Sequence, residues 1–261
     1  MPQQNKSALR RARRSGGQAT VEYLYVIPIL LILLLGSLQF IFIYEAKLAL
    51  NYATFVATRA GALQNGSMAA IQSGLYSGLA PLFTHGTDQQ ALKTARAFAK
   101  TELSNNKLAL ITIVNPTPDA YSGFAGSNAN APDDMPNDNL MYRDPADLQG
   151  GMNVQDANLL KVRVTYCVRL VVPIVNRMIY SFVVKPPATA AKIDSSTYQG
   201  TSIAAAELLK ATPGTTGSGL CIVSSEPNDP NYTYRIPVTS EAVVRMQSPF
   251  QDPGGGKWTA P

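Results

Sequence analysis

A single carboxylate, Glu22, stands at the entrance to a long uncharged stretch of the sequence. A carboxylate that meets lipid is costly unless a partner compensates its charge. Gly17 lies five residues before Glu22, and Pro28 lies six residues after it, where its missing N–H is expected to weaken and kink a helix. The pattern therefore predicts a charge that needs a partner at the edge of a membrane.

The other residues that could do chemistry are few and scattered. His85 is the only histidine, and it stands beside Gly86 in an expected turn, without clustered cysteines or carboxylates for a metal site. The sequence contains no GxxxxGKS or GxxxxGKT phosphate loop and no GxSxG nucleophile elbow. We therefore predict that the chain is not an enzyme and uses no cofactor and no metal.

Glu22 borders the run YLYVIPILLILLLGSLQFIFIY, residues 23–44, which contains no charged residue. At about 1.5 Å per residue, a helix of this length crosses a hydrocarbon core of roughly 30 Å. The run is too long for the apolar core of a cleavable secretory signal, which has about 7 to 15 residues. We therefore predict one transmembrane helix, and a multi-pass transporter is excluded because no other stretch approaches this length.

The basic residues of the chain are unevenly distributed. The first 17 residues contain no acid and five basic residues: Lys6, Arg10, Arg11, Arg13 and Arg14. They account for the whole formal charge of +5, because removing five from 22 Lys+Arg leaves 17 against 17 Asp+Glu. A domain without a basic excess does not favour nucleic acid as a partner. By the positive-inside rule, the N-terminus stays cytoplasmic and the C-terminal domain is periplasmic.

The segment GQATVEY, residues 17–23, resembles the prepilin peptidase site of type IV pilin-like proteins, in the GxxxxEY form of the Tad (tight adherence, Flp-type) family. The apolar run with Pro28 and the later ATRAGAL resemble the TadE-like branch, and LLKVRVTYCVRLVVPIVNRMI and YRIPVTSEAVVRMQSP are softer matches. Major Tad pilins are little more than one helix, whereas this chain continues far beyond one. The resemblance is therefore to a TadE-like minor pilin.

The resemblance implies cleavage between Gly17 and Gln18, because a residue without a side chain lets an intramembrane peptidase approach the backbone closely. It also implies that Glu22, next to Tyr23 in the motif, faces the amino terminus of a neighbouring subunit, a pairing that offsets part of the desolvation cost. The implied partners are prepilin peptidase, the inner-membrane pilus assembly platform, major and other minor pilins, and membrane lipid. The implied location is the bacterial inner membrane and, after incorporation, the extracellular pilus.

The function implied is that of a minor pilin or an assembly and initiation factor that supports pilus biogenesis, surface adhesion and biofilm formation. Two alternatives stay open. One is a filament-tip adhesin whose loop at 115–157 contacts a surface. The other is an ordinary single-pass periplasmic protein with no filament role, which would not be processed.

The fold class expected is α+β, with a long N-terminal helix, a second helix and an antiparallel sheet. Beyond the membrane, the first helix carries an apolar stripe that packs either in its own domain or against a neighbouring helix. The stripe consists of Ala49, Tyr52, Ala53, Val56, Ala60 and Leu63. A second helix is expected at 88–104, with Asp88 as its N-cap. Strands are expected at 108–114, 158–170, 174–184 and 233–246.

Four segments follow from these elements: a basic prepilin leader at 1–17, a transmembrane and extended helix at 18–64, a periplasmic α+β domain at 65–248, and a flexible tail at 249–261. The domain includes a long loop at 115–157 that is rich in Pro, Asn, Asp and Gly. Three acids of this loop suggest calcium, but their spacing does not match an EF-hand. They are Asp133, Asp134 and Asp138. A solvated loop is the favoured interpretation.

Cys167 and Cys221 are the only cysteines, and both lie on the expected periplasmic side, where disulfides persist. A bridge between them would restrict the unfolded chain by roughly 4 kcal/mol in the loop-entropy model. Two separate thiols are the alternative. The alternation of residues 158–170 places Cys167 on the polar face of its strand.

Overall fold

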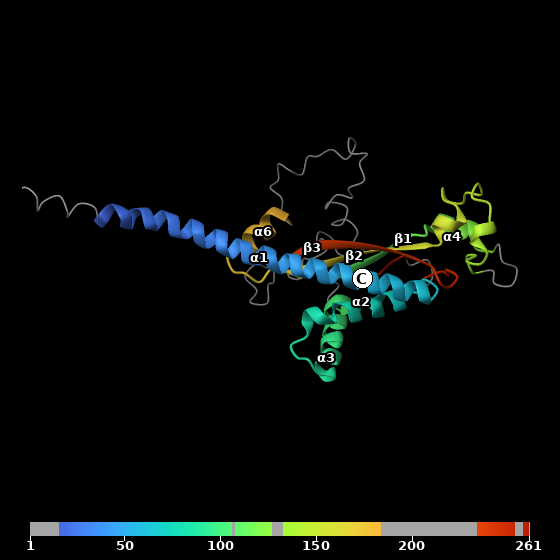
Figure 1. Ribbon diagram of the computed structural model, residues 1–261, viewed down its shortest axis with the longest axis horizontal. Coiled ribbons are helices and arrows are strands. Elements are labelled where there is room, and N and C mark those ends of the chain that lie inside the picture. Colours follow the sequence, from blue (N-terminus) through green and yellow to red (C-terminus); the bar gives the residue numbers. More distant parts are fainter. Residues whose placement is uncertain (1–15, 106–107, 127–132, 184–233, 254–257, 261) are drawn as a thin grey trace, which may run out of the picture.

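The computed structural model describes residues 16–105, 108–126, 133–183, 234–253 and 258–260. One long helix, α1 (Gly16–Leu63), runs through much of the molecule, and the sheet and further helices gather around its C-terminal half (Figure 1). Its N-terminal half extends beyond them. The predicted fold class, α+β with a long N-terminal helix and an antiparallel sheet, is confirmed.

The sheet has the strand order β3-β2-β1-β4, and each neighbouring pair is antiparallel. The strands are β1 (Ala109–Asn115), β2 (Leu159–Arg169), β3 (Arg235–Arg245) and β4 (Thr259–Ala260). Strands β2 and β3 pair over their whole length, from Leu159 opposite Arg245 to Arg169 opposite Arg235. The strands predicted at 108–114, 158–170 and 233–246 are confirmed.

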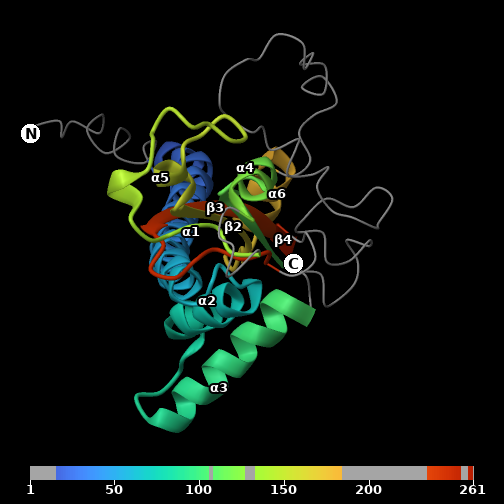
Figure 2. The ribbon, with the colours of Figure 1, turned by 90° about the vertical axis from the view of Figure 1, so that its right-hand side faces the viewer.

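Two helices follow α1 and cover it on one side. Helix α2 (Met68–Phe83) packs along α1, and α3 (Gln89–Lys100) packs on α2 and continues as a π-helical turn, Thr101–Asn105 (Figure 2). The predicted cap of the second helix is confirmed, because the Asp88 side chain accepts a hydrogen bond of 3.2 Å from the Ala91 N–H. Helix α2 was not expected from the sequence.

The core lies between one face of the sheet and the helices. Strand β2 contributes alternate side chains that are buried: Leu160, Val162, Val164, Tyr166 and Val168. Helix α1 contributes a line of small and branched residues: Ala46, Leu50, Ala53, Ala57 and Ala62. The predicted stripe on α1 is therefore correct in part: Ala53 is buried in the core, whereas Tyr52 and Leu63 are 60% and 52% exposed. The helix packs in its own domain, as one of the two alternatives proposed.

The side of α1 that faces α2 carries small residues, because two glycines of α2 bring the two helices close together. A Cβ added to Gly74 would lie 2.8 Å from the Ala57 Cα, and one added to Gly78 would lie 2.5 Å from the Ala53 Cα. The helices therefore approach each other so closely that only glycine fits opposite each alanine. Bulky residues such as Tyr52 could not occupy this contact.

Gly78→Ala is expected to destabilise the folded domain by about 1–3 kcal/mol, because the new methyl group overlaps the α1 backbone. Ordinarily, Gly to Ala in a helix interior gains about 1 kcal/mol. Gly36→Ala is the matched control, since no atom lies within 4 Å of the added Cβ. Thermal unfolding in detergent, followed by circular dichroism, measures the difference. An unchanged or higher melting temperature for Gly78→Ala would contradict this packing.

The predicted strand at 174–184 is wrong, because the segment forms helix α6 (Val175–Val183). Pro173 ends the extended chain, and a side chain from α1 then holds the turn that enters the helix: the Gln39 Oε1 accepts hydrogen bonds from the Val171 and Val172 N–H groups. β-branched and aromatic residues favour a strand by propensity. Here the contact with α1 overrides that preference.

The predicted loop at 115–157 contains short helices in its described parts, 115–126 and 133–157. It contains α4 (Pro118–Phe124), a 3-10 turn (Leu140–Tyr142) and α5 (Val154–Ala157), at the end of the molecule far from the start of α1 (Figure 1). Its apolar side chains enter the core: Phe124, Met135, Leu140, Val154 and Ala157. These scattered apolar residues lack a period, so the sequence pattern hid their packing.

Two described parts of the predicted tail, 249–253 and 258–260, contact the domain. Phe250 is fully buried, and its ring stacks on Trp258 with centroids 5.4 Å apart. The Asn65 side chain donates to the Pro249 carbonyl, and Gln251 N donates to the Asn65 carbonyl. Residues 249–253 and 258–260 thus pack on the domain. The contacts of the Phe250 and Trp258 rings stabilise this packing, although turn-forming residues surround them.

Candidate functional site

The predicted cleavage and assembly residues lie at the start of α1. Gly17 and Gln18 are in its first turn, and backbone positions 18 and 22 are one helical turn apart. Glu22 and Tyr23 are exposed. The helix begins at Gly16, so the motif that sequence reasoning singled out belongs to one continuous helix.

The N-terminal half of α1 exposes apolar side chains on all sides. Large apolar residues from Val21 to Tyr44 are mostly exposed, among them Leu24 at 69%, Leu33 at 64% and Phe40 at 64%. A helix that is apolar all round requires an apolar environment. By length and composition, α1 is the one helix among the described residues that could cross a membrane.

Glu22 is the only charged residue between positions 18 and 44. Among the described residues, no ion pair includes it. An exposed carboxylate on an otherwise apolar helix gains most from a cation supplied by another molecule, because a lone charge in low dielectric is costly. The site is therefore suited to ion pairing between molecules.

Pro28 lies inside α1, and the helix continues on both sides of it. Its ring removes one backbone hydrogen bond from the helix and crowds the preceding turn. The predicted kink at Pro28 stays a prediction. Pro28 lies between Glu22 and the middle of the apolar half of α1. We expect it to weaken the helix close to the motif.

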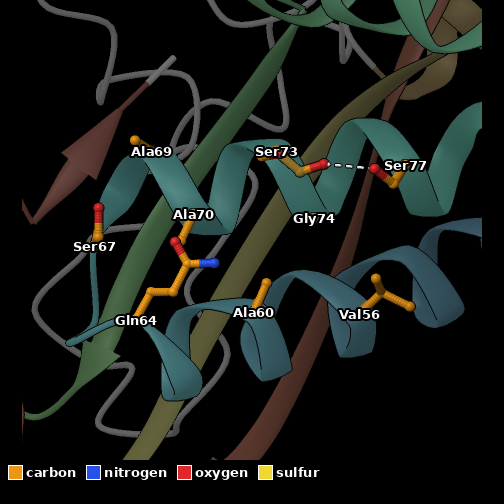
Figure 3. Close-up of a pocket in the computed structure, with 9 residues that line it drawn as sticks. All are labelled: Val56, Ala60, Gln64, Ser67, Ala69, Ala70, Ser73, Gly74 and Ser77. Atoms are coloured by element: carbon orange, nitrogen blue, oxygen red, sulfur yellow. Dashed lines mark hydrogen bonds between the residues drawn. The ribbon is translucent and has the colours of Figure 1, made fainter. Parts of the chain in front are cut away.

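A second candidate is a shallow groove of about 400 Å³ between α1 and α2 (Figure 3). It is lined by Val56, Ala60, Gln64, Ser67, Ala69, Ala70, Ser73, Gly74 and Ser77. The Ser77 hydroxyl donates to the Ser73 carbonyl at 2.9 Å, and the Arg96 guanidinium donates to the Ser73 hydroxyl. None of the lining residues is a histidine, cysteine or carboxylate that could activate a serine. The groove reflects the close contact of two helices rather than a reactive site.

A buried ion pair ties the turn after α3 to the sheet. The Arg235 Nη2 donates to the Glu102 Oε1 at 2.6 Å, and the Arg235 Nη1 donates to the Cys167 carbonyl at 3.1 Å. Burial raises the pKa of the neighbouring Tyr166 hydroxyl to about 12, and the Arg235 charge opposes part of that rise. This cluster joins the N-terminal end of β3 to the π-helical turn after α3, so its role is structural.

A surface ion pair joins strands β2 and β3 further along the sheet. Glu241 accepts from Lys161 at 2.9 Å and from Arg163 at 2.5 Å. The hydrogen bond from Lys161 lowers the pKa of the Glu241 carboxyl, and Arg163 adds to this effect while burial opposes it. The predicted polar face of β2 is therefore occupied by cross-strand pairing at these positions.

Cys167 lies on the predicted face of β2, with Lys161 and Arg163, but it is fully buried there beside Leu108 and Leu110. It is disulfide-bonded. Cys221 lies outside the described residues, and its pairing with Cys167 stays a prediction. The alternation of the strand was correct, but both faces are covered near Cys167.

The remaining candidate residues do not converge. His85 is exposed in the turn before α3. The acids of the 115–157 segment are engaged separately, because Asp138 pairs with Arg143 at 3.2 Å and the Asp134 Oδ1 accepts from the Gln251 side chain at 2.6 Å. Over the parts of the chain that the structure describes, no three His, Cys, Asp or Glu side chains gather as a metal site would require.

Gln39 is the residue that sequence reasoning missed. It is fully buried in the otherwise exposed apolar half of α1, and its amide oxygen binds the turn before α6. A lone amide within an apolar run was the only signal that could have revealed it.

The N-terminal segment matches a known family. The model of the TadE-like protein family matches residues 17–59, which begin at Gly17 and include most of α1. This match confirms the resemblance drawn from the GxxxxEY motif and the apolar run. No curated protein and no solved structure matches the chain.

Proposed function

We propose that this TadE-like chain is a minor pilin, or an assembly and initiation factor, of a Tad-type type IV pilus. The observation that supports the proposal most is the start of α1, where Glu22 is the one charge between positions 18 and 44 and has no ion-pair partner among the described residues. The family match supports a pilus-related role, and the unpaired charge of Glu22 supports the role of a minor pilin or assembly factor.

Glu22 couples exit from the membrane to docking with a neighbour. After cleavage, the new amino group of Gln18 is a cation at the lipid boundary, and Glu22 is an anion one helical turn deeper. Each desolvated charge is stabilised by pairing with the opposite charge of an adjacent subunit. Leaving the bilayer is therefore favourable only when another subunit is present.

The arrangement of the domain suits assembly along α1. The folded elements pack on the C-terminal half of the helix, so most of its N-terminal half stays open to contact with lipid or with other pilins. The partners proposed are prepilin peptidase, the inner-membrane assembly platform and other pilins, with the N-terminus cytoplasmic and the domain periplasmic. The role is structural rather than catalytic.

Maturation is the direct test of this function. In peptidase-competent cells the chain is expected to lose its first 17 residues and their five positive charges, whereas in peptidase-deficient cells it keeps them. Intact-mass measurement of the purified protein distinguishes the two forms. Gly17→Leu is expected to block cleavage by placing a side chain at the scissile bond, and Gly16→Leu, one residue outside it, is the matched control. The same unprocessed N-terminus in both strains would refute the proposal.

A further inference from the structure

Helix α6 and the turn before it expose four large apolar side chains, here called the apolar row, that the folded domain leaves uncovered. Val171 is 62% exposed, Ile174 60%, Met178 44% and Phe182 73%. Met178 and Phe182 lie one turn apart on the same side of α6, and Val171 and Ile174 lie in the turn that leads into it. Contiguous exposed apolar residues of this kind mark a contact with a membrane or with a protein.

The segment is fixed to α1 at a defined level. Gln39 Oε1 accepts hydrogen bonds from the N–H groups of Val171 and Val172, at 3.1 Å and 2.8 Å. On the opposite side, the Tyr180 ring packs against Tyr234 with centroids 5.2 Å apart. Figure 1 shows α6 beside α1, at the end of the domain nearest the free half of the helix. These contacts prevent the apolar row from turning inward.

Gln39 lies just inside the expected surface of the bilayer. The uncharged run ends at Tyr44, five residues after Gln39. At about 1.5 Å per residue, Gln39 is roughly 8 Å inside that end of the run. The turn before α6 is therefore at the lipid boundary where α1 emerges, at the depth to which an interfacial helix buries its apolar face.

The charges of the segment suit an anionic lipid surface. Arg169 and Arg177 are exposed, and residues 169–183 contain no acid. Helical geometry places Arg177 and Ser181 next to the apolar row rather than within it. Basic residues beside exposed apolar residues are typical of a helix that lies in the plane of the membrane interface.

We infer that α6 is an interfacial helix, and that the apolar row formed by Met178 and Phe182 with Val171 and Ile174 of the preceding turn inserts into the lipid leaflet from which α1 of the same molecule emerges. Arg177 then lies at the level of the lipid phosphates. The domain is held on the membrane at two points, α1 and α6, and extraction must remove both from lipid. The inference depends on α1 crossing the membrane and not on the pilus role.

Fluorescence quenching of the full-length chain in lipid vesicles tests this contact. Phe182→Trp is reconstituted in phosphatidylglycerol with phosphatidylcholine that is brominated near the headgroup. We expect at least about twofold stronger quenching by this lipid than for Ser181→Trp, the matched variant beside the apolar row on the same helix. Water-soluble acrylamide is expected to quench the two variants in the reverse order. Trp258 contributes the same background to both.

Two further measurements make the outcome decisive. Leu30→Trp, in the middle of the apolar half of α1, must be quenched by lipid brominated deep in the acyl chain, which verifies the span itself. If Leu30→Trp is quenched while Phe182→Trp behaves like Ser181→Trp, the inference is wrong. Protection of Phe182→Trp that disappears when the protein is diluted in the vesicles would assign the apolar row to a second copy of the chain and would equally overturn the lipid contact.

Discussion

Arg235→Met is expected to destabilise the folded domain by about 3–5 kcal/mol, because it leaves a buried carboxylate without its cation. The Arg235 and Glu102 side chains are only 8% and 13% exposed. The guanidinium also donates to the Cys167 carbonyl, so the substitution removes that hydrogen bond as well. Urea or thermal unfolding in detergent, followed by circular dichroism, measures the loss.

The chain provides two controls for this result. Arg245→Met removes the same side chain from the opposite end of β3, where it is exposed, and is expected to change stability by no more than about 0.5 kcal/mol. Combining Arg235→Met with Glu102→Met removes both charges and is expected to recover part of the loss. If the double variant is as unstable as Arg235→Met, the unpaired charge is not the cause.

Elements defined by local patterns could be predicted from the sequence. The uncharged run of residues 23–44 predicted the N-terminal half of α1, because an apolar run of that length is long enough to cross a membrane as a helix. Asp88 marks the start of α3, because an N-cap acts on the N–H groups of the next turn. The alternation within residues 158–170 predicted β2 and its core face.

Elements defined by distant contacts could not be predicted in this way. Helix α2 contains Gly74, Gly78 and Pro81, which reduce its helical signal, and its glycines make sense only opposite α1. Helix α6 is rich in residues that favour strands. Its entry is held by Gln39, 133 residues before Val172.

The candidate site shows the same difference between local patterns, which could be predicted from the sequence, and distant contacts, which could not. The motif from Gly17 to Tyr23 is contiguous, so its recognition required no tertiary structure. The family match begins at the same glycine. By contrast, Arg235 and Glu102 are separated by 133 residues, and no property of either residue alone identifies the other as its partner. Pairs of this kind require the fold.

Glu22→Gln is expected to abolish filament assembly while leaving maturation intact. The amide keeps the size of the side chain and its capacity for hydrogen bonds but cannot neutralise the amino group of a neighbouring Gln18. Loss of a close charge pair in low dielectric costs about 3–5 kcal/mol when one partner is left unpaired. At about 1.4 kcal/mol for each tenfold change, subunit docking would weaken by more than a hundredfold.

The test compares variants in a strain that lacks the native chain, with filaments counted by electron microscopy and the N-terminus measured by mass. Glu45→Gln is the matched control, because Glu45 is an exposed carboxylate on the same helix just beyond the apolar run. It is expected to support normal piliation, since water already solvates its charge. Normal piliation with Glu22→Gln would contradict pairing between subunits. Failure of Glu22→Gln to be cleaved would assign the carboxylate to recognition by the peptidase instead, because docking is possible only after the amino group of Gln18 has been released.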